Sequence, residues 1–282
     1  MFVSKEIVFL ELQKTGCTHI RNLLMEVVGG NLVEKHNQLS ENFNTDGAIL
    51  VGSIRNPWEW YNSLWAYGCD RKGAIYKRVT RKRGSSFRGL GWKKNPRSAL
   101  STFLEDLFRH PDKWRRTYQD VSDAGAFREW LSMVHDPATW NDLGDDYGNS
   151  NLSKTAGLLT YRFLKLFCCR KGAQSRLNDI KSSEELSQFD SDFNFMGFFI
   201  RNESLENDLL KALELSGVKV SPSNRTLIMS GTRTNSSSRK YDVSYYYDKK
   251  SEDIVMNREM LVVKKFGYIP PSHRNEYVVE GK

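Results

Sequence analysis

The segment Ile7–Leu12 is a mostly apolar run of strand length, and it constrains the fold more than any other feature of the 282-residue chain. Such a run predicts a buried parallel strand of an α/β protein. It leads into the turn Gln13–His19, after which Ile20–Val28 has the pattern of a helix that closes at Gly29-Gly30. The chain therefore opens with a strand, a short glycine-containing turn and a helix.

Strand-like and helix-like segments alternate along the rest of the chain. Further strands are predicted at residues 31–34, 48–54 and 195–200, and residues 221–239 have the polar composition of a loop. Helices are predicted at 58–67, 100–108, 127–134, 155–167, 203–216 and 252–266. This alternation predicts an α/β fold in which helices flank a central parallel sheet, as a single domain spanning residues 1–282.

Composition indicates a globular protein, with 39% hydrophobic and 27% charged residues. No apolar run approaches the roughly 20 residues that a membrane span needs, and the charged start leads directly into a strand, without the pattern of a signal peptide. The four cysteines lack CxxC spacing, which argues against a zinc site or a disulfide framework. We therefore expect a cytoplasmic location.

A basic stretch is predicted to form an insertion or flap at residues 68–95. Ten Lys or Arg and no acidic residue lie between Arg71 and Lys94, in a chain whose net charge is +8. The stretch could steer an anionic ligand toward a site, or it could be a solvated loop whose charge serves solubility. Binding to nucleic acid is a third interpretation, but the stretch carries no recognised base-reading motif.

The turn Lys14-Thr15-Gly16-Cys17-Thr18 has the composition of an anion-binding loop. Amides at a helix N-terminus lack partners within the helix and favour negative charge. A lysine and two threonine hydroxyls add donors for a phosphate or sulfate, and a glycine allows close approach of the backbone. Lys14 precedes the glycine, so the loop departs from the GxxxxGK[ST] pattern of ATP-dependent P-loop enzymes.

A second anion-binding element follows the strand predicted at residues 48–54. Arg55 lies where that strand ends, at the edge of the sheet at which ligands bind in such folds. Pro57 is placed to begin a helix with Asn56 as its cap. Ser63 then lies about two turns along that helix. Arg55 could also be a structural arginine paired with a nearby carboxylate.

These two elements together resemble the signatures of sulfotransferases that use 3′-phosphoadenosine 5′-phosphosulfate (PAPS). That family carries a Lys-[Thr/Ser]-Gly-x-[Thr/Ser] loop after its first strand, and an Arg followed eight positions later by a Ser, as Arg55 is by Ser63. The resemblance implies a P-loop-like fold. It also implies that Lys14, Thr15, Gly16, Cys17 and Thr18 bind the 5′-phosphosulfate, that Arg55 and Ser63 bind the 3′-phosphate, and that no metal is needed.

Later segments extend the resemblance to carbohydrate sulfotransferases. The stretch Gly197–Glu203 resembles their late core strand, and Asn235–Tyr247 resembles their C-terminal cofactor loop, which makes Arg239 a candidate cofactor ligand. His19 stands where cytosolic members place a Trp against the adenine. The resemblance and the seven tryptophans favour a carbohydrate acceptor. The region from Gly68 to Phe193 has no match in the family.

The acceptor hydroxyl needs a base, and His36 is the favoured candidate. It follows the short strand predicted at residues 31–34 and can therefore reach the same sheet edge as Lys14. Histidine titrates near neutral pH, which suits a general base, and related enzymes place a catalytic His or Glu in this region. Glu34 and His19 are the alternatives. Lys14 would stabilise charge on the leaving phosphate oxygen. An atypical P-loop kinase is the competing enzyme class.

Overall fold

The computed structural model describes residues 1–45, 47–81, 111–231 and 241–273. Its five-stranded sheet has the order β3-β1-β2-β4-β5. The strands are β1 (Phe2–Val3), β2 (Ile7–Leu10), β3 (Asn31–Leu32), β4 (Ile49–Ile54) and β5 (Phe198–Arg201). The strands β2, β4 and β5 are parallel, whereas β1 runs antiparallel to both β2 and β3. The protein is thus α/β, but its sheet is mixed and not parallel as predicted, because the antiparallel strand β1, which the prediction missed, lies between β2 and β3.

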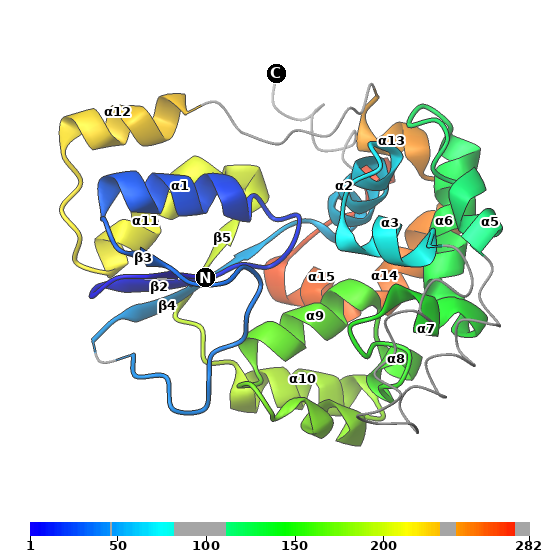
Figure 1. The fold of residues 1–282 in the computed structure, drawn as a ribbon, viewed down its shortest axis with the longest axis horizontal. Coiled ribbons are helices and arrows are strands. Elements are labelled where there is room, and N and C mark those ends of the chain that lie inside the picture. The colour runs from blue at the N-terminus through cyan, green and yellow to red at the C-terminus, as the bar shows by residue number, and fades with distance from the viewer. Residues whose placement is uncertain (46, 82–110, 232–240, 274–282) are drawn as a thin grey trace, which may run out of the picture.

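Alternate residues of the strands supply two separate hydrophobic cores, as the two-residue period of a strand requires. On one face, Ile7 and Phe9 of β2 pack with the helices α1 (Cys17–Val27), α11 (Leu205–Leu215) and α12 (Pro222–Ser230). Figure 1 shows these three helices together on one side of the sheet. The neighbouring residues of β2, Val8 and Leu10, belong to the larger core on the opposite face.

Aromatic side chains join the opposite face of the sheet to its helices. Phe163 and Phe167 of α9 (Leu158–Phe167) lie 5.4 and 5.1 Å from the ring of Phe199 in β5, measured between ring centroids. Phe266 of α15 (Met260–Phe266) lies 5.2 Å from the same ring. The helix α10 (Ser183–Phe193) contacts α15. The face therefore carries a continuous aromatic layer, which also explains Gly52 in β4, where a Cβ would come within 3.0 Å of both Phe167 and Phe199.

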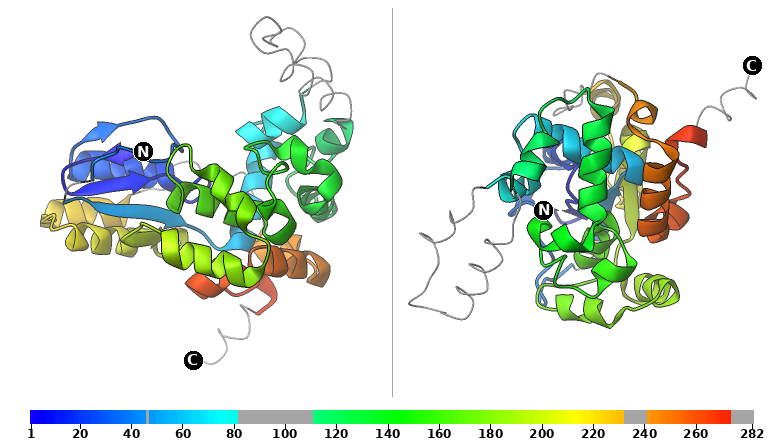
Figure 2. Two further views of the ribbon diagram at one scale, coloured as in Figure 1. Left: turned by 90° about the horizontal axis from the view of Figure 1, so that it is seen from below. Right: turned by 90° about the vertical axis from the view of Figure 1, so that its right-hand side faces the viewer.

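The remaining helices gather beyond the carboxyl ends of the parallel strands, as Figures 1 and 2 show from three sides. Their core contains the buried rings of Trp58, Trp60, Trp65, Trp114 and Trp130. These five tryptophans are therefore unavailable for stacking on a sugar, and the part of the carbohydrate prediction that depended on them fails.

The helices of this region are α2 (Pro57–Cys69), α3 (Ala74–Val79), α5 (Pro111–Arg116), α6 (Ala124–His135), α7 (Trp140–Leu143), α8 (Leu152–Thr155), α13 (Val243–Tyr246) and α14 (Lys249–Arg258). Short 3₁₀ turns lie at η2 (Pro137–Thr139), η3 (Gln174–Asp179), η4 (Asn202–Ser204) and η5 (Pro271–His273).

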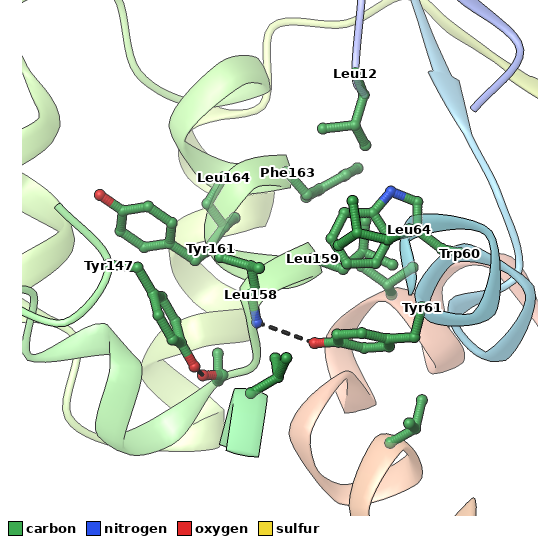
Figure 3. Packing of buried hydrophobic residues seen from close by; sticks show 14 of the residues in the cluster. Leu12, Trp60, Tyr61, Leu64, Tyr147, Leu158, Leu159, Tyr161, Phe163 and Leu164 are labelled. Atoms are coloured by element: carbon green, nitrogen blue, oxygen red, sulfur yellow. Dashed lines mark hydrogen bonds between the residues drawn. The ribbon is translucent and has the colours of Figure 1, made fainter. Parts of the chain in front are cut away.

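A buried carboxylate, that of Glu259 between α14 and α15, links this part of the chain to the helix α9 by hydrogen bonds. Glu259 is fully buried and accepts hydrogen bonds from the Thr160 amide (2.7 Å), the Thr160 hydroxyl (2.6 Å) and the hydroxyl of Tyr61. It thereby satisfies amides at the N-terminus of α9, where negative charge is favoured. The Tyr61 hydroxyl in turn accepts from the Leu158 amide, which Figure 3 shows within the surrounding hydrophobic cluster.

Several predicted boundaries are wrong. The predicted insertion at residues 68–95 begins within ordered helices, since α2 reaches Cys69 and α3 covers Ala74–Val79; residues 82–95 lie outside the described part of the chain. The polar stretch 221–239 contains the helix α12, and the helix predicted at 252–266 is divided into α14 and α15. The helix predicted at 100–108 also lies outside the described residues.

Candidate functional site

The loops that follow β2, β4 and β5 converge on a cleft of about 680 Å³ at the carboxyl edge of the sheet. Gln13, Lys14 and Gly16 follow β2, Arg55 follows β4 and Asn202 follows β5, and all of them contribute to the walls of the cleft. This edge is where ligands bind in open α/β sheets, and the volume suits a nucleotide-sized molecule. The residues predicted at these strand ends therefore border one cavity.

The loop after β2 has the backbone geometry of an anion cradle. Lys14 has a φ of 64° and Gly16 a φ of 82°, so two left-handed residues flank Thr15 before the right-handed helix α1 begins. Alternation of hand turns successive N–H groups toward one side, as in phosphate-binding loops. Gly16, the N-cap residue of α1, has no side chain with which to cap the helix, and the first turn of α1 holds no acidic residue. The positive end of the helix is thus left for an anion in the cleft.

Gly16 is needed for a second reason. A Cβ at this position would lie 2.7 Å from Leu205 Cδ1 and 2.8 Å from Asn202 Nδ2, so the loop after β5 packs directly on the glycine. The left-handed φ also disfavours any residue with a side chain. The glycine therefore serves both the turn and the contact between two strand-end loops.

The side chains of Lys14 and Thr15 differ in their access to the cleft. The Lys14 ammonium lies 3.9 Å from the centroid of the Tyr67 ring, and both residues line the cleft. The Thr15 hydroxyl instead donates to the Leu12 carbonyl (2.7 Å) and lies 2.6 Å from Ser53 Oγ, fully buried beneath the loop. Thr15 can therefore contact a ligand only through its backbone N–H, and not through its hydroxyl as predicted.

Arg55, just before α2, and Ser63, in the middle of that helix, line the same cleft as Lys14. Asn56 caps that helix with its side-chain oxygen and Pro57 occupies its first turn, as predicted. The Arg55 guanidinium lies 3.0 Å from the Glu59 carboxylate one turn along. The predicted alternative of a structural ion pair is therefore present, but a guanidinium has further donors with which to hold an anion at the same time.

His36 is held in one tautomer by the backbone of the loop after β2. Its Nδ1 lies 2.8 Å from the Glu11 carbonyl oxygen, and because a carbonyl only accepts, Nδ1 carries the proton. The other ring nitrogen, Nε2, then keeps its lone pair in the neutral ring. Partial burial of the ring, part of which is exposed to solvent, lowers the pKa of His36 below its usual 6.5, against the opposing effect of the Glu11 hydrogen bond. The ring is thus a neutral base near pH 7, as the prediction requires.

His36 also lines a second cavity, of about 490 Å³, on the other side of the loop after β2. Gln13 and His36 border both cavities, whereas Lys14, Arg55 and Ser63 border only the first. A base at the boundary of two cavities can face a different molecule in each.

The other candidates from the first turn of α1 also lie in the first cleft. Thr18 and His19 line it, and His19 is buried against the end of α12, where a Cβ on Gly231 would lie 3.2 Å from its Cε1. Cys17 lines it as well, and burial raises the pKa of its thiol to about 11. Cys17 is therefore a neutral thiol near pH 7. Arg239 lies outside the described residues.

The only grouping with metal-ligand spacing found among the described residues is Glu11, Cys17 and His36, whose ligand atoms all lie within 4.8 Å. A cation there would face the Arg21 guanidinium, 3.7 Å from the Glu11 carboxylate, and the amino group of Met1 at 2.8 Å. The raised pKa of the Cys17 thiol opposes binding further. These charges make the grouping a poor cation site.

Sequence patterns did not identify several residues of the first cleft. Lys35, Glu59, Tyr67, Asn202 and Asp242 all line it. Tyr67 lies one helical turn beyond Ser63 in α2, so the helical period could have placed it on the same face. Asn202 follows a strand predicted to end at this edge and could have been found in the same way as Arg55. Lys35 and Asp242 gave no comparable signal.

No family model, curated protein or solved structure was found to match this chain. In the portion of the chain that the structure describes, no helix is both long and apolar enough to cross a membrane.

Proposed function

We propose that the protein is a sulfotransferase that transfers a sulfuryl group from PAPS to a hydroxyl group, with a carbohydrate as the acceptor. One observation carries the proposal: the N-terminus of α1, where the N-cap residue is Gly16, borders the same cleft as Lys14, Arg55 and Ser63. The two sequence elements that resemble PAPS-dependent sulfotransferases lie 37 or more residues apart in the chain, yet they meet at this cleft. Such a meeting is what a ligand with two anionic ends requires.

The residues of the cleft fit such a donor. Its 5′-phosphosulfate suits the amides of Gly16, Cys17 and Thr18 at the start of α1, together with the Lys14 ammonium. Its 3′-phosphate suits Arg55, just before α2, and Ser63, in the middle of that helix. His19 is buried and lines the same cleft, and in our proposal it contacts the adenine.

The chemistry requires little covalent work from the protein. PAPS supplies a sulfuryl group on a phosphate leaving group, and sulfuryl transfer, like phosphoryl transfer, depends mainly on positioning and charge stabilisation. In our proposal, His36 Nε2 accepts the proton of the acceptor hydroxyl, since the Glu11 carbonyl holds Nδ1 protonated. Lys14 and the amides of α1 stabilise the negative charge that develops on the leaving oxygen.

An atypical P-loop kinase is the alternative, because a phosphate-binding loop alone would suit both enzymes. A kinase would need a carboxylate that holds magnesium, commonly at the end of a neighbouring strand. The strand β4 is followed instead by Arg55, which favours a second anionic group over a metal ion. The interpretation as a nucleic-acid-binding protein was based on the basic residues 71–94. Of these, Arg78 donates a hydrogen bond to the Asp142 carbonyl at 3.2 Å and so has a structural role.

The decisive activity assay measures transfer of radiolabelled sulfate from PAPS to a panel of oligosaccharides, with and without EDTA. We expect transfer that survives EDTA, since protein cations replace the metal of kinases. A parallel assay with ATP and magnesium tests the kinase. Transfer from ATP that EDTA abolishes, with none from PAPS, would overturn the proposal.

A further inference from the structure

The second cavity presents a cationic wall beside the catalytic base. Arg162 and Lys165 of α9 and Lys171 beyond it line this cavity together with His36. Arg162 is close enough to His36 for its charge to contribute to the lowered pKa of that imidazole. The cationic wall and His36 therefore border the same cavity.

Arg162 has the environment expected of a ligand-binding residue. Its side chain is only 7% exposed, and its Nε donates to Asp145 at 3.2 Å. Its Nη1 is buried and has no hydrogen-bond partner among the residues that the structure describes. A buried charged donor without a partner is costly, so such a group is normally satisfied by a ligand or water.

The carboxylates around the cavity do not neutralise this wall. Asp145 is shared between Arg162 and Lys165, which lies 2.8 Å away, so one negative charge faces two positive charges. Lys171 adds a third cation. Glu11 lies near Arg21, 3.7 Å away, and the exposed Glu34 accepts a hydrogen bond from the side chain of Asn37. The wall formed by α9 thus keeps an excess of positive charge.

We propose that this second cavity is the acceptor site and that its ligand is an acidic saccharide, with a carboxylate or sulfate held by Arg162. The inference rests on the proposed function and specifies the class of acceptor. The anionic group would satisfy the buried guanidinium, while the neighbouring sugar hydroxyl lies toward His36. Lys171 would contact the same ligand nearer to the solvent.

The rest of the lining suits a sugar better than a phenol. Amide and hydroxyl side chains are frequent in it, and Phe43 is the single aromatic residue in the part of the lining that the structure describes. A flat aromatic acceptor would need apolar and aromatic walls, whereas sugar hydroxyls need hydrogen-bonding partners. The polar residues are Gln13, Asn37, Gln38, Ser40 and Gln174.

The test measures saccharide binding by calorimetry with the full chain saturated with 3′-phosphoadenosine 5′-phosphate (PAP), which keeps anions out of the first cleft. The probes are a disaccharide that ends in glucuronate, its counterpart that ends in glucose, and that counterpart carrying a 6-O-sulfate. We expect the anionic probes to bind roughly 10- to 100-fold more tightly than the neutral one, as a charge-assisted hydrogen bond implies. The two anionic probes distinguish a carboxylate from a sulfate.

Variants test whether the preference for the anionic probes arises in the second cavity. Arg162→Gln should bring the ratio of affinities close to one, Arg162→Lys should keep part of it, and Lys171→Gln should reduce it. Because Arg162 is buried, its variants are first checked by thermal unfolding, and the exposed Lys171 supplies a test that does not depend on them. Lys219→Gln, an exposed lysine between α11 and α12, is the matched control and should leave the ratio unchanged.

The outcomes separate this inference from the proposed function. If PAP binds but the three probes bind equally or not at all, or if Lys171→Gln and folded Arg162 variants keep the full preference, the acidic acceptor is wrong and the sulfotransferase stands. If PAP fails to bind, the proposed function is wrong. The same titrations without PAP then decide whether the cavity selects anionic saccharides.

Discussion

Replacing His36 tests the catalytic base, and the structure indicates which substitution to use. His36 has a φ of 59°, a left-handed conformation that Asn tolerates better than Ala. The amide of Asn can also take the place of Nδ1 and donate to the Glu11 carbonyl, now 2.8 Å from that nitrogen. His36→Asn therefore retains the backbone and the hydrogen bond while it removes Nε2, the atom proposed to accept the proton.

Loss of a general base costs about 10²- to 10⁴-fold in rate. We expect His36→Asn to lower kcat by about that factor, with PAP affinity nearly unchanged. His36→Ala should show the same loss of kcat and, in addition, a stability lower by about 1 kcal/mol, because its hydrogen bond is lost. The difference between the two variants separates chemistry from folding.

The pH profile gives an independent readout. The neutral imidazole is the active form, and burial lowers its pKa below 6.5. The activity of the wild-type protein should therefore fall only as the pH drops below about 6.5, and His36→Asn should lack this acidic limb. Steady-state kinetics from pH 5 to 8 measure both effects. A His36→Asn variant with nearly normal kcat and an unchanged acidic limb would refute the role of His36, and Glu34 would be tested next.

Three further predictions concern the cleft and the core. Lys14→Ala should lower kcat by about 10²- to 10³-fold with an unchanged circular dichroism spectrum, because it removes charge stabilisation at the leaving oxygen; normal turnover would contradict this, and the exposed Lys5→Ala is the control. Gly157→Ala should lower the free energy of unfolding by about 1–3 kcal/mol, because its Cβ would lie 2.0 Å from Glu259 Oε1; Gly125→Ala, in helix α6, should not. Burial lowers the pKa of His135 to about 3, so the native protein excludes a proton that the unfolded chain binds below pH 6.5. The free energy of unfolding should therefore fall by about 1.4 kcal/mol per pH unit as the pH drops from 6.5 toward 3. Urea unfolding at several pH values measures this fall, and it should be smaller for His135→Phe than for the wild-type protein.

The sequence was sufficient to locate the first cleft, because its main residues follow strand ends. The strands at Ile7–Leu10 and Ile49–Ile54 carry strong apolar patterns, and parallel strands bring the residues after them to one edge. Lys14 and Arg55 could be placed together on that argument alone. The helix cap at Asn56 was equally local, since its signal is the adjacent Pro57.

Features that depend on tertiary contacts could not be predicted. The two-residue strand β1 has too little pattern to be recognised, yet it makes the sheet mixed. The Thr15 hydroxyl points into the core because Ser53, 38 residues away, lies beneath it. The second cavity combines residues 11–43 with α9, a region of the chain that showed no family resemblance. Such contacts between distant segments carry no local signal.

The central claim is that the first cleft holds a nucleotide with both a 5′ and a 3′ anionic group. Calorimetric titration of the chain with PAP and with ADP tests it most directly, together with the Arg55→Gln variant. We expect PAP to bind at least about 10-fold more tightly than ADP, as one charge-assisted hydrogen bond of about 1.5–3 kcal/mol implies, and we expect Arg55→Gln to remove that preference. Equal affinity for PAP and ADP in the wild-type protein would contradict the account.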